Sequence, residues 1–306
     1  MLQIKKDNKI YDVDINYFPN GEINIKLDPI IINNNYKIVF KWFDDKDFIH
    51  LYFFVNYLKQ LNTFKRCDGL FIPYLPYSRM DRIENNNMFT LKYIADFINQ
   101  FNFKKVEVLE PHSDKSLQLI KNIRPIYSSI QMLYDYMKQL KEDITIVFPD
   151  KGAYNRYSKL IDEQYINQIF KYNYNIQYCD KKRDFKTGKI KNIQLKTHEK
   201  IYDRVIIIDD LCSKGGTFVG CKNTILKNNS NVKYFDLIIT HIEFDSIEQG
   251  PIFKHDNDQS NVKFNKLIIT DSMMNNKCGN VVEMMFYLSA SMSELKIQLI
   301  DFKRFF

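Results

Sequence analysis

The sequence predicts an α/β protein of two similar halves, each built on a mainly parallel β-sheet flanked by helices. Two observations predict this class. Short unbroken apolar runs alternate with segments whose apolar residues recur at helical spacing, and the alternation starts again near the middle of the chain. Unbroken apolar runs indicate strands that are buried on both faces, as in parallel sheets. The chain has 306 residues, 45% of them apolar, so it can bury two cores of ordinary size.

The first half contains three expected strand–helix units. Strands are expected at KIVFKW (37–42), GLFIPY (69–74) and KVEVLE (105–110). Helices are expected at 48–61, after Asp114, and in a segment where Leu91, Ile94, Ala95 and Ile98 recur at helical spacing.

The second half repeats this pattern. Strands are expected at ITIVFPD (144–150), RVIIIDD (204–210), YFDLIITH (234–241) and KLIITDS (266–272). Helices are expected at 218–226 and at 281–292, and the latter could pack back on either half. We therefore expect two domains, residues 1–143 and residues 144–306, with the boundary near Asp143.

Composition limits the class of protein. Five cysteines without a CxxC pair argue against a disulfide framework and favour a reducing cytoplasm. The first residues, MLQIKKDNKIYDVDI, have no signal-peptide core, and no apolar stretch approaches a membrane span, so we expect a soluble protein without membrane contact.

The net charge of +7 is concentrated in one segment. Residues 181–200 carry eight basic residues against Asp184 and Glu199, a local net charge of +6. Such a run is either a solvated loop or an anion-binding segment. No stripe of basic and aromatic residues follows elsewhere, which argues against single-stranded nucleic acid as a ligand.

The segment RVIIIDDLCSKGGTF (204–218) is the strongest candidate for a site. Asp209 and Asp210 follow a buried strand, at the edge where open parallel sheets bind ligands. The small residues after them allow backbone amides and a helix N-terminus to converge on an anion. Carboxylates beside an anion site suit a ribose phosphate, with hydroxyls on the carboxylates and the phosphate on the loop. The residues expected in that loop are Ser213, Lys214, Gly215, Gly216 and Thr217. A capped helix after an ordinary strand would explain Gly-Gly-Thr alone.

This segment resembles the ribose-phosphate signature of the type I phosphoribosyltransferase fold. Other segments narrow the resemblance to the ribose-phosphate pyrophosphokinase family, in that family's order from about Phe18 to about Thr270. They are YFPNGEINIKL (17–27), FIPYLPYSRMDR (71–82), VLEPHSDKSLQ (108–118), VFPDKGAYNR (147–156) and CDKKRD (179–184). The resemblance implies two tandem phosphoribosyltransferase-like domains and transfer of the diphosphoryl group of ATP to ribose 5-phosphate.

The resemblance also implies roles for individual residues. It makes His112 and Asp150 ligands of Mg²⁺ on the ATP phosphates. It places adenine between Phe18 and Arg79, with Asn20 and Glu22 at its edge, from a neighbouring subunit of a dimer or hexamer. Asp81 is expected at the ATP site too, although Asp81 and Arg82 would equally form a salt bridge. Lys181, Lys182 and Arg183 are expected to start a flexible catalytic loop that closes over the transferring phosphates.

Some positions depart from the family pattern. Ser213 and Lys214 stand where the family usually has Asp and Thr, Asn155 stands where a Lys is common, and Met80 where a Gln is common. Three alternatives therefore stay open: a related enzyme acting on a larger acceptor such as ADP-ribose, a phosphoribosyltransferase, and a non-catalytic regulatory homologue.

Overall fold

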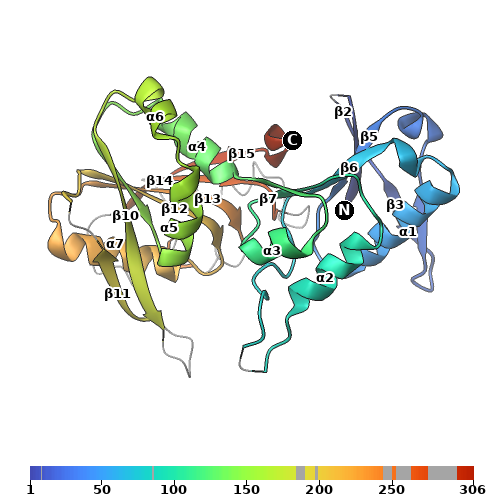
Figure 1. Ribbon diagram of the computed structural model, residues 1–306, viewed down its shortest axis with the longest axis horizontal. Helices are drawn as coiled ribbons and strands as arrows, with labels where there is room; N and C mark the ends of the chain where they lie inside the picture. The colour runs from blue at the N-terminus through green and yellow to red at the C-terminus, as the bar shows by residue number, and fades with distance from the viewer. Residues whose placement is uncertain are drawn as a thin grey trace. The chain divides into compact units, whose positions relative to one another are not determined.

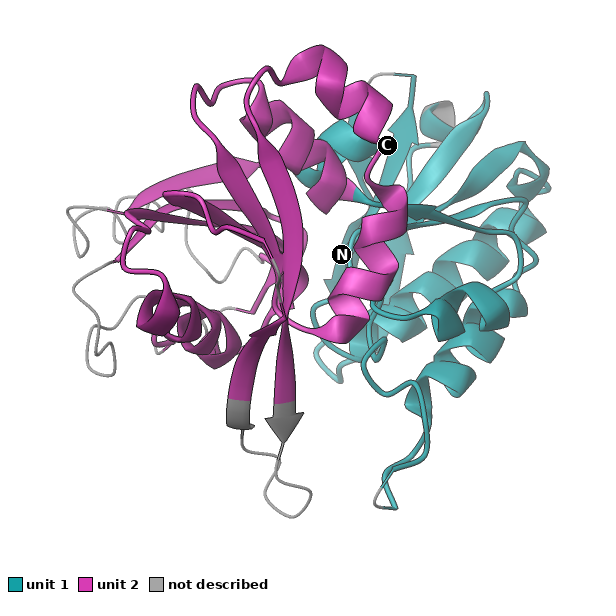
Figure 2. Ribbon diagram, turned by 60° about the vertical axis from the view of Figure 1, so that its left-hand side comes forward, with its two compact units in different colours: residues 1–127, 302–306 teal, residues 128–301 magenta. Residues whose placement is uncertain are grey.

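The structure is a computed structural model that describes residues 1–7, 9–84, 86–183, 190–196, 199–243, 250–252, 263–274 and 295–306. The chain divides into two compact units (Figure 2). Unit 1 comprises residues 1–127 and 302–306, and unit 2 comprises residues 128–301. Each unit contains a mainly parallel sheet with helices, which confirms the predicted α/β class. The helix expected at 281–292 lies outside the described residues.

The sheet of unit 1 has the strand order β2-β1-β5-β6-β7-β8 (Figure 1). Its parallel strands are β5 (Tyr36–Phe40), β6 (Cys67–Ile72), β7 (Val106–Leu109) and β8 (Ile123–Ile126). Strands β1 (Leu2–Lys6) and β2 (Lys9–Asp12) extend it antiparallel. A separate hairpin pairs β3 (Asp14–Tyr17) with β4 (Ile23–Lys26).

The two faces of this sheet are covered differently. Alternate residues such as Ile38 and Phe40 belong to one apolar cluster, which includes side chains of α1 (Lys46–Gln60) and α2 (Thr90–Asn99). Val39 and Phe71 face the other way and contact the last residues of the chain. There the 3₁₀ helix η6 (Phe302–Phe305) stacks Phe302 on Phe71 with ring centroids 6.1 Å apart. The short helix α3 (Asp114–Leu119) connects β7 to β8.

The sheet of unit 2 has the strand order β11-β10-β9-β12-β13-β14-β15. Its parallel strands are β9 (Ile144–Phe148), β10 (Tyr174–Arg183), β12 (Arg204–Cys212), β13 (Tyr234–Ile242), β14 (Phe264–Thr270) and β15 (Lys296–Ile300). Strand β11 (Ile190–Lys196) pairs antiparallel with β10 at one edge. The chain leaves β9 toward β10 on one side and returns to β12 on the other, so the strand order reverses between β9 and β12. Ligands of open α/β sheets bind at such a reversal.

Helices of unit 2 are α4 (Ser128–Met137), α5 (Lys151–Tyr157), α6 (Glu163–Ile169) and α7 (Gly216–Asn228). Helix α4 is tied to β13, because the Tyr136 hydroxyl donates to Asp236 Oδ2 at 2.9 Å and the Ser128 and Thr240 hydroxyls are 2.8 Å apart. The compact units therefore divide before α4, whereas the boundary expected at Asp143 falls after it.

Candidate functional site

The reversal between β9 and β12 leaves two strand ends side by side. The ladder between them ends at the pair Val147 and Ile207. Beyond it, β9 leads through Pro149 to Asp150, and β12 continues through Asp209 and Asp210 to Cys212. Carboxylates from two neighbouring strands thus lie at the edge where ligands bind in this architecture.

Asp150 is held in two ways. As the N-cap of α5, its Oδ1 accepts the backbone N–H of Ala153 at 2.8 Å. Its Oδ2 lies 2.5 Å from Lys181 Nζ. Burial alone would raise the pKa of Asp150, but the charge and hydrogen bond of Lys181 outweigh it and lower the pKa below its ordinary value. Asp150 is therefore an ionised carboxylate that is already paired with the Lys181 ammonium.

Lys181, Lys182 and Arg183 were expected at the start of a loop, and the structure places them on a strand instead. Strand β10 continues through all three, and Lys181 pairs with Ile193 of β11. The register shifts between Lys182 and Arg183, whose side chains lie outside the described residues, as does the segment 184–189. The hairpin thus brings Lys181 to Asp150.

The two adjacent aspartates of β12 have different surroundings. Asp209 is half-buried, and its side chain is hydrogen-bonded to that of Asp210. Burial and the neighbouring charge of Asp210 raise the pKa of Asp209 well above its usual value. Asp210 is only 3% exposed, and Arg156 Nη1 of α5 lies 3.3 Å from its Oδ1. The sequence analysis did not assign Arg156.

The turn after β12 has the backbone expected of an anion loop. Gly215 adopts φ +76° as the N-cap of α7, and a Cβ there would lie 2.8 Å from the Ile252 side chain. A Cβ on the exposed Gly216 would meet no atom within 4 Å. Lys214 is exposed, whereas the Ser213 hydroxyl donates to the carboxylate of Glu243, just after β13. Glycine is therefore required for backbone conformation only at the first of the two positions.

The charges at this edge leave room for a further cation. Three carboxyl groups, Asp150, Asp209 and Asp210, face two cations, Lys181 and Arg156, and besides burial the neighbouring carboxyl groups contribute to the raised pKa of Asp209. Among the described residues no group of three or more His, Cys, Asp or Glu side chains is gathered closely enough to hold a metal alone. A few carboxyl groups at the edge of a ligand site fit Mg²⁺, which usually takes one or two carboxylates together with substrate phosphates and water.

In unit 1, the β3–β4 hairpin presents the residues expected around adenine. The turn is closed by a backbone hydrogen bond in which the Phe18 N–H donates to Glu22 O at 2.9 Å. The Glu22 N–H donates to Asn20 Oδ1 at 3.2 Å. The Phe18 side chain is 53% exposed. Next to this turn, the hydroxyl of Tyr17, the last residue of β3, lies 2.8 Å from His50 Nε2 of α1. His50 Nδ1 in turn lies 3.2 Å from Asp47 Oδ1, so one hydrogen-bonded chain links hairpin and helix.

Arg79 is exposed in the segment after β6. That segment is anchored by Tyr77, which has φ +61° and donates its hydroxyl to Asp45 Oδ1 at 2.7 Å. Positive φ in a bulky residue stores strain and is common near functional sites. The sequence analysis paired Arg82 with Asp81, whereas the structure shows an ion pair between Arg82 Nε and Glu84 Oε2 at 2.9 Å.

His112 lies after β7, partly buried and just before α3. Two residues earlier, the buried Glu110 adopts φ +44°. Its N–H donates to Ile126 O of β8 at 2.9 Å, which fixes this bend at the carboxyl ends of the strands. The strained residue and the expected ligand thus share one turn.

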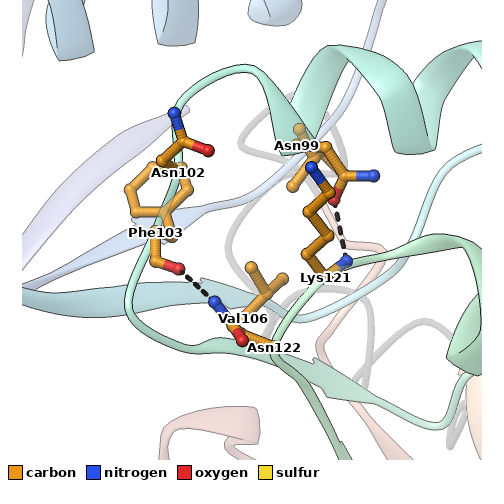
Figure 3. Close-up of a pocket in the computed structure, with 7 residues that line it drawn as sticks. Asn99, Asn102, Phe103, Val106, Lys121 and Asn122 are labelled. Carbon is orange, nitrogen blue, oxygen red and sulfur yellow. Dashed lines mark hydrogen bonds between the residues drawn. The ribbon is translucent and has the colours of Figure 1, made fainter.

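A small hollow in unit 1 has no comparable chemistry (Figure 3). It measures about 60 Å³, far below the roughly 300–1,000 Å³ of small-molecule sites. Its amide groups bond to backbone: Asn99 Oδ1 accepts the Lys121 N–H at 2.8 Å, and Asn122 Nδ2 donates to Phe103 O at 3.1 Å. These contacts brace the turns before β7 and β8.

Comparison of the sequence with known proteins shows the family to which the chain belongs. The chain is 30% identical to the ribose-phosphate pyrophosphokinase of Saccharolobus solfataricus over 225 residues, which cover 71% of this chain and 69% of the relative. The chain belongs to the ribose-phosphate pyrophosphokinase family. The enzyme of that name from Pyrococcus abyssi is 24% identical over 78% of this chain and 79% of its own length. No model of a protein family matches the chain.

Comparison with solved structures supports the fold of this member of the ribose-phosphate pyrophosphokinase family. The phosphoribosylpyrophosphate synthetase of Mycobacterium smegmatis superposes with a TM-score of 0.65, at 14% identity, over 94% of this chain and 86% of that one. The likeness supports the expected pair of phosphoribosyltransferase-like domains. In the ranges that the structure describes, no helix has the length and apolar character needed to cross a membrane.

Proposed function

We propose that the chain transfers the diphosphoryl group of ATP to the anomeric hydroxyl of ribose 5-phosphate. The anomeric oxygen forms a bond to the β-phosphorus, the bond from that phosphorus to the α-phosphate oxygen breaks, and AMP leaves. The hydroxyl proton passes to solvent. Family membership supports this reaction, and the alternatives from the sequence analysis are not favoured by the comparisons.

The observation that carries the site assignment is the convergence of Asp150, Lys181 and Asp209 at the strand reversal of unit 2. In our assignment Asp209 accepts hydrogen bonds from the ribose hydroxyls, and backbone N–H groups of Gly215, Gly216 and Thr217 hold the 5-phosphate at the start of α7. Lys181 leaves Asp150 and follows the transferring phosphates, where charge develops.

We assign Asp150 and His112 to Mg²⁺ bound with the ATP phosphates. The metal, when bound, neutralises phosphate charge and orients the group that is transferred. The chain's own contribution at Asp150 is a carboxylate fixed by the helix N-cap and kept ionised by Lys181. Phe18, Asn20, Glu22, Arg79 and Asp81 complete the ATP side.

From the family resemblance we also propose a homo-oligomer in which the β3–β4 hairpin, with its exposed Phe18, serves a neighbouring subunit. The described cysteines, Cys67, Cys179, Cys212 and Cys221, are buried and form no disulfide with one another, which suits the cytoplasm.

The test is release of AMP from ATP and Mg²⁺, with ribose 5-phosphate or ADP-ribose as acceptor. We expect AMP with ribose 5-phosphate. AMP formed only with ADP-ribose would identify the larger acceptor, and no AMP with either would exclude the proposed reaction.

A further inference from the structure

The paired aspartates of β12 cannot serve one ligand in the same way. Asp209 and Asp210 are adjacent on β12, and their side chains are hydrogen-bonded to each other. The two differ in exposure: Asp209 is half-buried, whereas Asp210 is only 3% exposed. Asp209 is therefore the more accessible of the two carboxyl groups for a sugar hydroxyl.

Arg156 stands opposite the buried carboxylate. Its Nη1 lies 3.3 Å from Asp210 Oδ1, and the two side chains are 16% and 4% exposed. The guanidinium also lies over the Tyr157 ring, 5.5 Å from its centroid. Buried charges of this kind occur when they are paired, since a single charge left in the interior is costly. The two residues therefore belong together.

Their contact joins the two elements that carry the proposed site. Helix α5 begins at Asp150 and contains Arg156, while β12 carries both Asp209 and Asp210. The ladder between β9 and β12 has already ended at Ile207, so backbone hydrogen bonds between these two strands do not hold the end of β12. The ion pair supplies a link at that point.

We infer that Arg156 is a positioning residue, which acts through Asp210 to hold the end of β12 against α5 and so keeps Asp209 in place for the ribose hydroxyls. This inference rests on the proposed function. It assigns unequal roles to the two aspartates: Asp209 binds the acceptor, and Asp210 binds Arg156.

One observation offers a competing role. Among the described residues, Arg156 Nη1 is buried without a hydrogen-bond partner, because the contact with Asp210 is close but poorly aligned. A spare donor of this kind could instead contact a substrate phosphate directly. A double-mutant cycle separates the two roles, since a residue that acts only through Asp210 loses its effect once Asp210 is changed.

The experiment compares wild type, Arg156→Met, Arg156→Lys, Asp210→Asn and the double variant Arg156→Met with Asp210→Asn. Wild type must first release AMP from ATP and ribose 5-phosphate; failure there would contradict the proposed function, not the pairing. For Arg156→Met we expect the KM for ribose 5-phosphate to rise about tenfold, with the KM for ATP changed by less than about twofold. In the double variant the KM for ribose 5-phosphate should be no higher than in the more affected single variant. Arg156→Lys should raise this KM less than Arg156→Met does.

Thermal unfolding gives a second readout that needs no activity. Arg156→Met leaves a buried carboxylate uncompensated, so the double variant should unfold at a higher temperature than Arg156→Met alone. The inference would be overturned if the rise in the KM for ribose 5-phosphate in the double variant equalled the product of the rises in the two single variants. A double variant less stable than both single variants would also overturn it. If Arg156→Met fails to fold, the cycle of Arg156→Lys, Asp210→Asn and their double variant gives the same KM comparison.

Discussion

Replacing Lys181 by methionine removes the ammonium that lies 2.5 Å from Asp150 Oδ2. The two side chains are only 18% and 26% exposed, so the contact is a charge-assisted hydrogen bond largely shielded from water. Such bonds contribute about 1.5–3 kcal/mol net. Mg²⁺ must displace Lys181 from this carboxylate to use it, so the variant should bind Mg²⁺ about 10- to 100-fold more tightly in the absence of nucleotide.

Turnover should change in the opposite direction. If Lys181 moves to the transferring phosphates, its loss removes a cation that acts at the transition state, and kcat should fall about 100- to 1,000-fold. The KM for ATP should change much less. Calorimetric titration with Mg²⁺ and initial rates of AMP release measure the two effects. Lys196→Met is the matched control, because it removes the same charge from an exposed position on β11.

Two results would refute this reasoning. Turnover within threefold of wild type would remove Lys181 from the reaction. Unchanged Mg²⁺ affinity, with Lys196→Met also unchanged, would mean that the contact with Asp150 does not compete with the metal.

Three further changes test other parts of the site. Asp209→Asn should raise the KM for ribose 5-phosphate about tenfold or more in steady-state kinetics, because the amide is a weaker acceptor for sugar hydroxyls. Gly215→Ala should cost about 1–3 kcal/mol of unfolding free energy in denaturant titration, since φ +76° disfavours a side chain and the new Cβ would lie 2.8 Å from Ile252. His50→Gln should raise the KM for ATP about threefold to tenfold in the same kinetics, because it breaks the hydrogen-bonded chain from Tyr17 to α1 that supports the β3–β4 hairpin, to which we assign adenine binding.

Each of these has a contradicting outcome. An unchanged acceptor KM in Asp209→Asn would separate that carboxylate from the ribose. Gly216→Ala is the control for the glycine turn, since a Cβ there meets nothing within 4 Å, and equal destabilisation by both changes would contradict the backbone argument. A KM for ribose 5-phosphate that rises as much as that for ATP in His50→Gln would indicate a general loss of structure.

The central strands could be predicted because their signal is local. The run Val205–Ile208 is buried along its whole length in the middle of β12, and a sequence window alone identifies such a strand. Strand β10 gives no such signal, since its sequence YNIQYCDKKR is largely polar. Its antiparallel partner β11 begins only after residues 184–189, which lie outside the described residues. The basic end of β10 therefore suggested a loop. Strand β8 has only four residues and includes Pro125, so it too was missed.

The residues of the candidate site could be named from the sequence, but their contacts with one another could not. Asp150, Lys181 and Asp209 could be named from motifs and the family resemblance, because each stands in a recognisable segment. The contact of Arg156 with Asp210 depends on which side of β12 faces α5, and that is decided by strand order and pairing across the sheet. A pattern of residues along the chain carries no signal for it.

The proposed reaction is tested most directly by the fate of the β-phosphate of ATP. With ATP labelled at that phosphate, Mg²⁺ and ribose 5-phosphate, the label should appear in phosphoribosyl pyrophosphate in amounts equal to the AMP released. Label found in ADP, or in free pyrophosphate formed whether or not ribose 5-phosphate is present, would contradict transfer of a diphosphoryl group to the sugar.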